Sequence, residues 1–247
     1  MRMIILMALL FGSLLNAEEI YATFDVHASR QSGLTLASSG VVKNIHVDVG
    51  SQVKAGSLLL ELDNDELIQS LKLAEEEAKL AETEHRFAKK SYERYLQVKD
   101  VIDADQLDLY TLNYEKSLHI LGRAKSALAY KKALLKKSRL YAPYDGIIAQ
   151  RHVEVGDGVS SATMETLFTL INEGRVTLIL RFDEKYWTRV KKGAKFEYRV
   201  DGLDQMFTGT IVKVYPAVEA KTRKAIAEVH TTGLPPGLFG DGMIKVD

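Results

Sequence analysis

Side chains that could support catalysis are sparse in this sequence and do not form known motifs. The chain has no cysteine, which excludes disulfides, thiolate nucleophiles and cysteine metal sites. Gly156-Asp157-Gly158 begins a dinucleotide-binding pattern, but Ser161 occupies the place of the third glycine and no strand-to-helix unit follows. A phosphate-binding loop, a Gly-x-Ser-x-Gly elbow and a His-Glu-x-x-His helix are all missing. We therefore expect a protein that is not an enzyme and that carries no cofactor.

Potential metal ligands are scattered along the chain. His46 and His152 occupy matching positions of an internal repeat, and ordinary strand positions explain them better than a metal site. Met164, Met206 and Met243 are expected in the core or in turns, because capture of a soft metal requires clustered thioethers. The sequence thus predicts no metal site.

The charge balance gives no reason to expect a nucleic-acid partner. The 33 lysines and arginines equal the 33 aspartates and glutamates, so the formal net charge is zero. At the N-terminus, Arg2 precedes an apolar run at residues 3–15 that is too short to span a bilayer comfortably. We interpret residues 1–17 as a secretory signal cleaved after Ala17, with an uncleaved anchor as the alternative. The rest of the chain is then expected to be exported and soluble.

An internal repeat organises the chain. Residues 40–50 and 146–156 have identical Gly, His, Val, Val and Gly at matching positions, and Val/Ile and Asp/Glu exchanges fill three of the other six. Each copy continues into an apolar segment that predicts a strand. The glycines that bound the two copies are expected in turns that favour a residue without a β-carbon; they are Gly40, Gly50, Gly146 and Gly156.

Between the two copies, residues 63–140 are predicted to form an antiparallel coiled-coil hairpin. In the first helix, apolar and small residues alternate at steps of four and three, at Leu67, Leu71, Ala74, Ala78, Ala81, His85, Ala88, Tyr92 and Tyr95. The second seam contains Leu107, Tyr114, Leu118, Leu121, Leu128 and Leu135, interrupted by Thr111, Lys125 and Lys132. Asp103, followed three residues later by Gln106, matches a helix start, and Ala142-Pro143 is expected to end the second helix.

The last part of the chain, residues 173–247, contains short β-rich runs separated by turn residues. This pattern favours a small antiparallel β-barrel. A short helix, opened by Asp183 and closed by Gly193, is expected to interrupt the strands. Residues 18–32 are predicted to be a separate N-terminal strand segment. The fold class is therefore α+β.

The segments 33–62 and 141–172 resemble the two halves of a lipoyl or biotinyl domain, a barrel-sandwich hybrid. Such carriers present a modified lysine on the tight hairpin that joins the halves, whereas here a coiled coil takes its place. A split lipoyl-like module with an inserted helical hairpin, followed by a β-barrel, resembles the periplasmic adaptor, or membrane fusion protein, family of tripartite efflux and secretion pumps (the HlyD and RND-adaptor type). The runs that carry this resemblance are VGSQVKAGSL at 49–58, APYDG at 142–146, Thr222-Arg223 and PGLFG at 236–240.

The resemblance implies a periplasmic protein, held at the inner membrane through its partner, that links an inner-membrane transporter to an outer-membrane channel and exports drugs or other small toxic compounds. An RND-type transporter is favoured and an ABC-type one is possible, and copies of the chain would associate into a ring. The family's membrane-proximal fourth domain is expected to be absent or rudimentary, so that contact with the transporter falls mainly on the barrel. The alternatives are a lipoyl- or biotinyl-type carrier and a metal-ion efflux adaptor.

The same resemblance implies that the tip of the hairpin docks on the channel. The family's tip has an arginine, a leucine four residues on, a serine preceded by isoleucine, and an aspartate five residues after that serine. In this chain a valine replaces the leucine, and an aspartate replaces the serine and lies closer to the arginine. The implied docking residues are Arg94, Val98, Val101, Ile102, Asp103 and Asp108. The alternatives are a solvated charge for Arg94 and a helix cap for Asp103.

Overall fold

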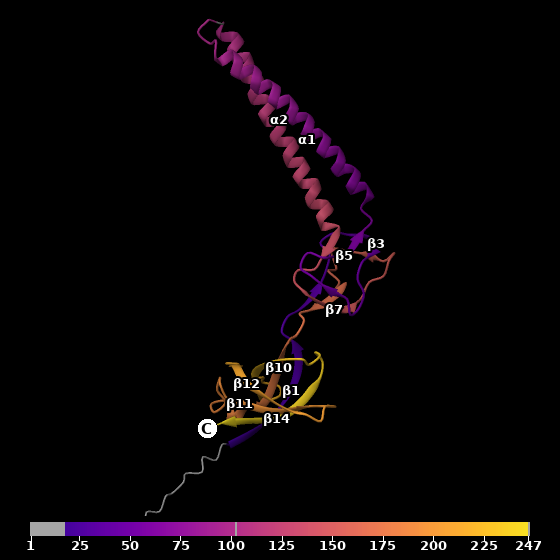
Figure 1. The fold of residues 1–247 in the computed structure, drawn as a ribbon, viewed down its shortest axis with the longest axis vertical. Coiled ribbons are helices and arrows are strands. Elements are labelled where there is room, and N and C mark those ends of the chain that lie inside the picture. Colours follow the sequence, from indigo (N-terminus) through magenta and orange to yellow (C-terminus); the bar gives the residue numbers. More distant parts are fainter. Residues whose placement is uncertain (1–17, 102, 247) are drawn as a thin grey trace, which may run out of the picture. The chain divides into compact units, whose positions relative to one another are not determined.

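The computed structural model describes residues 18–101 and 103–246, which divide into two compact units. Of the described residues, one unit contains 18–31 and 171–246, and the other contains those within 32–170. Figure 1 shows a β-barrel in the first unit, and a small β-module with a long helical hairpin in the second. None of the described helices combines the length and the apolar character that a membrane crossing requires. The predicted signal segment, 1–17, lies outside the described residues.

Six antiparallel strands close the barrel of the first unit. Around the barrel they follow the order β1 (Glu18–Ala28), β10 (Arg175–Asp183), β13 (Lys224–Thr232), β12 (Met206–Val214), β11 (Lys195–Val200) and β14 (Phe239–Val246), and β14 pairs again with β1. Residues 18–28 are thus a barrel strand, not the separate segment expected for 18–32. The reason is that the alternating Ile20, Ala22, Phe24 and Val26 all fill the barrel core, and pairing on both sides of β1 removes a free edge.

The short helix expected after Asp183 is a single 3₁₀ turn, η1 (Glu184–Tyr186). The Asp183 carboxylate accepts a hydrogen bond from the Lys185 amide at 3.0 Å and so caps the turn. Turns and irregular backbone follow as far as β11, with Val190 buried in the barrel core and Trp187 at the surface.

The second unit contains two four-stranded sheets in which the half-repeats interlock. One sheet has the order β2 (Gln31–Leu34), β9 (Phe168–Ile171), β7 (Gly146–Arg151) and β4 (Gln52–Val53). The other has the order β6 (Arg139–Tyr141), β5 (Leu58–Leu62), β3 (Gly40–Ile45) and β8 (Gly158–Val159). Strand β3 of the first copy pairs with β8 of the second, and β7 of the second pairs with β4 of the first. Neither copy therefore buries its apolar face alone.

Gly50 and Gly156 make matching backbone contacts in the two copies. The Gly50 amide donates to the carbonyl of Ile148 at 2.8 Å, and the Gly156 amide donates to the carbonyl of Val42 at 2.9 Å. Their φ angles are +85° and +96°, in the left-handed region that a residue with a β-carbon rarely adopts. Both turns thus require glycine for the same conformational reason.

Gly40 and Gly146, which we also expected in turns, are instead the first residues of β3 and β7. At Gly40 the constraint is close packing, because a β-carbon there would lie 3.1 Å from Leu62 Cδ1. The two glycines that begin the copies therefore differ in role from the two that end them.

Helices α1 (Asp65–Leu96) and α2 (Ala104–Lys137) pack antiparallel, as the heptad pattern predicts (Figure 1). Every seam position predicted on α1 is buried or half-buried, and Ala74, Ala78 and Ala81 are the buried residues of this helix. These small side chains allow the second helix to approach closely.

The seam of α2 differs from the predicted one in phase. Ser117 is buried, whereas Leu118 is 45% exposed and Lys125 lies at the surface. The Ser117 hydroxyl lies 3.0 Å from His85 Nδ1 and donates to the Tyr114 carbonyl at 2.7 Å. A small, hydrogen-bonded serine fits between closely packed helices, and the larger leucine is turned outward.

Helix α2 also ends earlier than the proline signal suggested, at Lys137 instead of Ala142. Ser138 follows as its C-terminal cap and is fixed by strand β5, since the Leu62 amide donates to the Ser138 carbonyl at 3.0 Å. Strand β6 then begins and buries Leu140 in the core of the module. Burial of this strand outweighs the helical preference of the preceding residues.

Candidate functional site

The tip of the hairpin exposes apolar side chains. Val101 is 83% exposed and Val98 is 43% exposed. Ile102, the third apolar residue that we predicted here, lies outside the described residues. Neighbouring valines at the end of a largely polar arm have no core of their own to enter, so another protein is a reasonable destination for them.

Charged residues lie close to these valines in the sequence. Arg94, Asp103 and Asp108 are all exposed, and within the described residues no ion pair engages Arg94 or Asp108. Asp103 is the N-cap of α2, since its carboxylate accepts from the Asp105 amide at 3.2 Å. The contact with Gln106 runs through the backbone, where the Gln106 amide donates to the Asp103 carbonyl at 3.1 Å. Asp103 therefore has a structural role, and docking by the tip residues stays a prediction.

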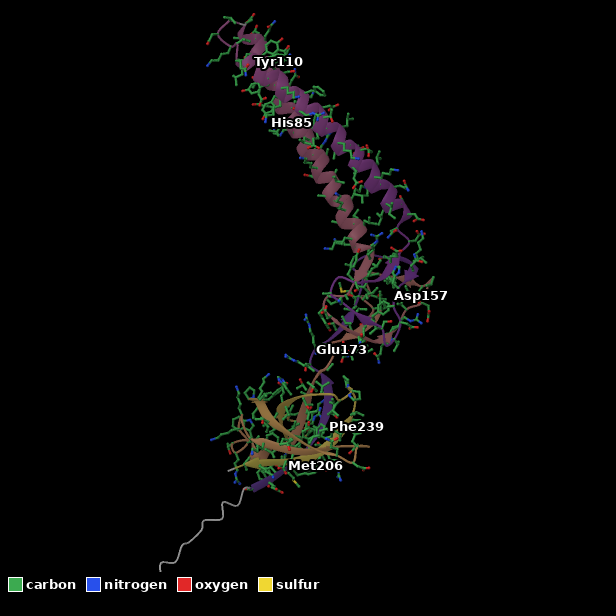
Figure 2. The ribbon with its side chains drawn as sticks, in the orientation of Figure 1. His85, Tyr110, Asp157, Glu173, Met206 and Phe239 are labelled. Atoms are coloured by element: carbon green, nitrogen blue, oxygen red, sulfur yellow. The ribbon has the colours of Figure 1, made fainter. Side chains whose placement is uncertain are left out.

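Stacked aromatic rings join the two helices below the tip. The ring centroids of Tyr95 and Tyr110 are 3.8 Å apart, and those of Tyr92 and Tyr114 are 5.0 Å apart. His85 continues this row further along the hairpin, 5.4 Å from Tyr114 (Figure 2). Such stacking adds specific packing to a seam that elsewhere consists largely of small residues. It makes the distal part of the hairpin a defined platform for the tip.

Arg94 lies beside the outer end of this aromatic row. The pKa of the Tyr110 hydroxyl is raised, mainly by a hydrogen bond with Tyr95 and secondly by burial. The positive charge of Arg94 lowers the same pKa. The guanidinium is therefore near the Tyr95–Tyr110 pair while it remains exposed. The sequence analysis missed Tyr110; its spacing of four residues from Tyr114 was the available signal.

An exposed apolar row along α1 also escaped the sequence analysis. Leu73, Leu80 and Phe87 are 63%, 61% and 60% exposed, and their spacing of seven residues places them on one side of the helix, outside the seam. The spacing itself was visible in the sequence. On α2, the residues that line a shallow groove include Leu112, Lys116, His119, Ile120 and Arg123.

The two helices carry opposite charge toward the base of the hairpin. Residues 63–84 contain eight aspartates and glutamates against two lysines, whereas residues 116–139 contain eight lysines and arginines and no acidic residue. Within the part of the chain that the structure describes, one ion pair joins the two helices, with Lys132 Nζ 3.8 Å from Glu75 Oε1. Much of the opposite charge therefore remains available on the outer surfaces of the hairpin.

Two methionines contradict the expectation of core or turn positions. Met206, labelled in Figure 2, is 64% exposed, and Met243 is also exposed. Both lie on strands and line one groove on the surface of the barrel. Met164, by contrast, lies in a turn. Among the described residues, no group of three or more histidine, cysteine, aspartate or glutamate side chains could hold a metal ion.

A comparison with protein families places this arrangement. Residues 31–172 match the CzcB-like barrel-sandwich hybrid domain. The chain belongs to this CzcB-like family. The match includes both half-repeats and the inserted hairpin, and it confirms the predicted lipoyl-like module and the resemblance to periplasmic adaptor proteins.

Two curated relatives share part of their length with this CzcB-like chain. The cobalt-zinc-cadmium resistance protein CzcB of Cupriavidus metallidurans is 27% identical over 215 residues, which cover 81% of this chain and 40% of CzcB. The multidrug resistance protein MdtA of Cronobacter turicensis is 28% identical over 163 residues, which cover 63% of this chain and 38% of MdtA. The chain thus spans about two fifths of the length of these relatives.

A solved structure has the same fold as the CzcB-like chain. The crystal structure of a MacA-MexA chimeric protein, which contains the α-hairpin domain of Pseudomonas aeruginosa MexA, matches with a TM-score of 0.78 at 18% identity, over 94% of this chain and 82% of that one. This likeness confirms the predicted α+β fold, in which a barrel-sandwich module with an inserted hairpin is combined with a β-barrel.

Proposed function

We propose that this chain is the adaptor subunit of a tripartite efflux assembly in the periplasm, where it links an inner-membrane transporter to an outer-membrane channel. The observation that carries the proposal is the insertion of a long hairpin, α1 with α2, between β5 and β6 of the lipoyl-like module. A lipoyl carrier has a short turn with its modified lysine at that place, whereas this chain has an arm suited to reach another protein. The proposed role is mechanical: the module and the barrel form part of a conduit, and the hairpin contacts the channel.

Metal ions are the second candidate cargo, beside drugs and other small toxic compounds. The match to CzcB, named for cobalt-zinc-cadmium resistance, covers 81% of this chain, and the match to MdtA, named for multidrug resistance, covers 63%. The two identities are nearly equal, at 27% and 28%, so they do not separate the two cargoes. The observation that favours metal ions is the family model that matches residues 31–172, which is named for CzcB.

Deletion of the gene is expected to make its host more susceptible to the exported compounds, because an efflux assembly without its adaptor has no closed path. Growth of the deletion strain would be measured against a panel of unrelated drugs and against Co²⁺, Zn²⁺ and Cd²⁺ salts. Greater sensitivity to drugs alone would identify drug efflux, and greater sensitivity to the cations alone would identify metal efflux. A gene that lacks the hairpin, residues 66–135, is the matched control and should not restore resistance. Unchanged growth in both panels would contradict the efflux function.

Association of copies into a ring is part of this proposal, and the two unlike edges of the hairpin support it. Helix α1 offers an apolar row and acidic charge, and α2 offers a groove and basic charge. Contacts between unlike surfaces generate a ring when the rotation between neighbours closes. If the hairpins are parallel to the ring axis, matching residues of all copies have the same position along that axis. Within one hairpin, His85 of α1 lies beside Ser117 of α2, and Tyr92 lies beside Tyr114. Phe87, between His85 and Tyr92 in the sequence, is therefore level with the groove on α2. In such a ring it is also level with the groove of the next copy.

Cysteine crosslinking tests this contact cleanly, because the natural chain has no cysteine. The double variant Phe87→Cys/His119→Cys is expected to form disulfide-linked oligomers under mild oxidation, which a non-reducing gel would resolve. The control, Phe87→Cys/Lys136→Cys, places the second cysteine on the same helix but further from the tip, out of reach of position 87 of the neighbouring copy. This variant should remain monomeric. Equal yields from the two variants would show that crosslinking reflects random collision and not the proposed register.

A further inference from the structure

The segment between β10 and β11 concentrates positive charge on a chain whose net charge is zero. Residues 185–195 contain no acidic side chain and five basic ones: Lys185, Arg189, Lys191, Lys192 and Lys195. The same segment contains Tyr186 and Trp187, the single tryptophan of the chain. Neither the hairpin nor the lipoyl-like module includes this surface, so it requires an explanation of its own.

Trp187 is held in place while one side of its ring stays accessible. The side chain is 40% exposed, and Nε1 donates to the carbonyl of Tyr215 at 3.1 Å, which fixes the ring against the end of β12. Together with Val190, Val214 and Pro216 it lines a mainly apolar groove of about 590 Å³. A tryptophan with its N–H satisfied and an apolar ring available is typical of side chains at a membrane interface.

Lys191 and Lys192 lie between this groove and a second, more polar hollow, because both residues line both. Three neighbouring basic side chains have carboxylate partners: Arg189 pairs with Glu18, Lys213 with Glu228 at 3.7 Å and Lys245 with Glu197 at 2.6 Å. Within the described residues, no ion pair engages Lys191 or Lys192. The two lysines therefore leave positive charge that the barrel itself does not balance.

We propose that this surface of the barrel, defined by Trp187, Lys191 and Lys192, binds a lipid bilayer that carries anionic phospholipids. The two ammonium groups contact headgroup phosphates, and the Trp187 ring lies among the headgroups with its apolar side toward the acyl chains. The aliphatic parts of the lysine side chains can cover apolar surface while their ammonium groups contact the phosphates. The apolar groove and the positive charges can therefore both contact the bilayer at the same time. Adjacent basic residues near an anionic leaflet are attracted additively.

A bilayer fits this surface better than a protein partner does. A protein would have to present carboxylates at the spacing of the two lysines and an apolar side chain shaped for the groove. An anionic bilayer offers phosphates at many positions and an apolar interior immediately below them, so it meets the same requirements without a specific register. The binding surface inferred here is independent of the channel and of the ring contact.

Tryptophan fluorescence of the full chain tests the proposal, because a single tryptophan lies inside the patch. Vesicles of phosphatidylglycerol and phosphatidylcholine are expected to shift the Trp187 emission to shorter wavelength, and brominated lipids should quench it. Vesicles of phosphatidylcholine alone should do neither, and added salt should weaken the binding. The variant Lys191→Gln/Lys192→Gln is expected to bind about thirtyfold more weakly. The matched control, Lys136→Gln/Lys137→Gln on helix α2, removes the same charge elsewhere and should bind like the natural chain.

Several results would overturn the proposal. The apolar run at residues 3–15 could hold the chain on vesicles by itself, but then both lipid mixtures would bind it and the emission of Trp187 would not change. An equal emission shift with inorganic phosphate alone would indicate a site for free anions. Equal affinity of the two lysine variants for anionic vesicles would remove the assigned role of the patch. Absence of any emission change with vesicles, together with capture of a protein by a photo-crosslinker at position 187, would identify a protein surface instead.

Discussion

The variant Gly240→Ala is expected to destabilise the barrel severely, with a loss of about 3 kcal/mol in the free energy of unfolding. Gly240 lies in β14, opposite Val200 of β11 and Phe24 of β1. A β-carbon at this position would lie 2.1 Å from the carbonyl oxygen of Arg199 and 2.5 Å from Cζ of Phe24. The methyl group therefore meets the backbone of a neighbouring strand on one side and an aromatic ring of the core on the other.

Neither neighbour of Gly240 can move away cheaply. The carbonyl of Arg199 belongs to a paired strand, and its displacement would break the closed ladder. Phe24 is fixed by edge contacts with Phe196 and Tyr198, at centroid distances of 5.8 and 5.2 Å. Since the free energy of unfolding of a whole domain is about 5–15 kcal/mol, the expected loss is a large fraction of the stability of the barrel.

Equilibrium unfolding in denaturant would measure this loss. Trp187 belongs to the barrel unit, so its fluorescence follows the barrel, while far-ultraviolet circular dichroism follows mainly the helices of the hairpin. The control is Gly158→Ala in β8, where the added β-carbon has open space and φ is not in the left-handed region. Equal barrel midpoints for the two variants would show that β14 adjusts to a side chain, contrary to the packing described here.

Much of the fold could be predicted because its signals are local. The heptad pattern of α1 predicts as seam residues the ones that the structure buries. It does so because the helical period decides which side of a helix faces its partner. The repeated glycines at 50 and 156 signal their turns because left-handed backbone is a property of the residue itself. The sequence could not show which residues of α2 face the seam. Whether Ser117 or Leu118 is buried depends on how closely α1 approaches.

The features that could not be predicted depend on partners distant in sequence. The alternating pattern of Ile20 to Val26 shows a strand, but only its pairing with β10 and β14 assigns it to the barrel. The clash that makes Gly240 necessary arises from three strands at once. At the candidate site, the tip residues were named from a family resemblance. The Phe87 row and the Trp187 patch became visible when exposure was known, because exposure of an apolar residue is a property of the folded chain.

The variant Arg94→Glu, which reverses the charge at this position, is expected to leave the chain folded. If the hairpin tip docks on an outer-membrane channel as proposed, the variant should weaken that docking about thirtyfold or more, the consequence of losing about 2 kcal/mol at a close charge pair. The side chain is exposed and lies outside the seam, so its replacement leaves the stacked Tyr92 and Tyr95 in place. The guanidinium offers a planar set of donors, four residues before the exposed Val98, which suits carboxylate or backbone oxygens on an opposing helix. A glutamate at this position removes those donors and repels an acidic partner.

Three measurements on cells that carry the variant separate docking from folding: periplasmic abundance of the chain, crosslinking from the tip to the channel, and resistance to the exported compounds. Lys90→Glu is the matched control, because it makes the same charge change at an exposed position one turn further from the tip. We expect normal abundance for both variants, with crosslinking and resistance lost only in Arg94→Glu. If Arg94→Glu crosslinks and protects as well as Lys90→Glu does, Arg94 is a solvated helical charge. The proposed contact with the channel would then rest on the exposed valines at the end of the arm.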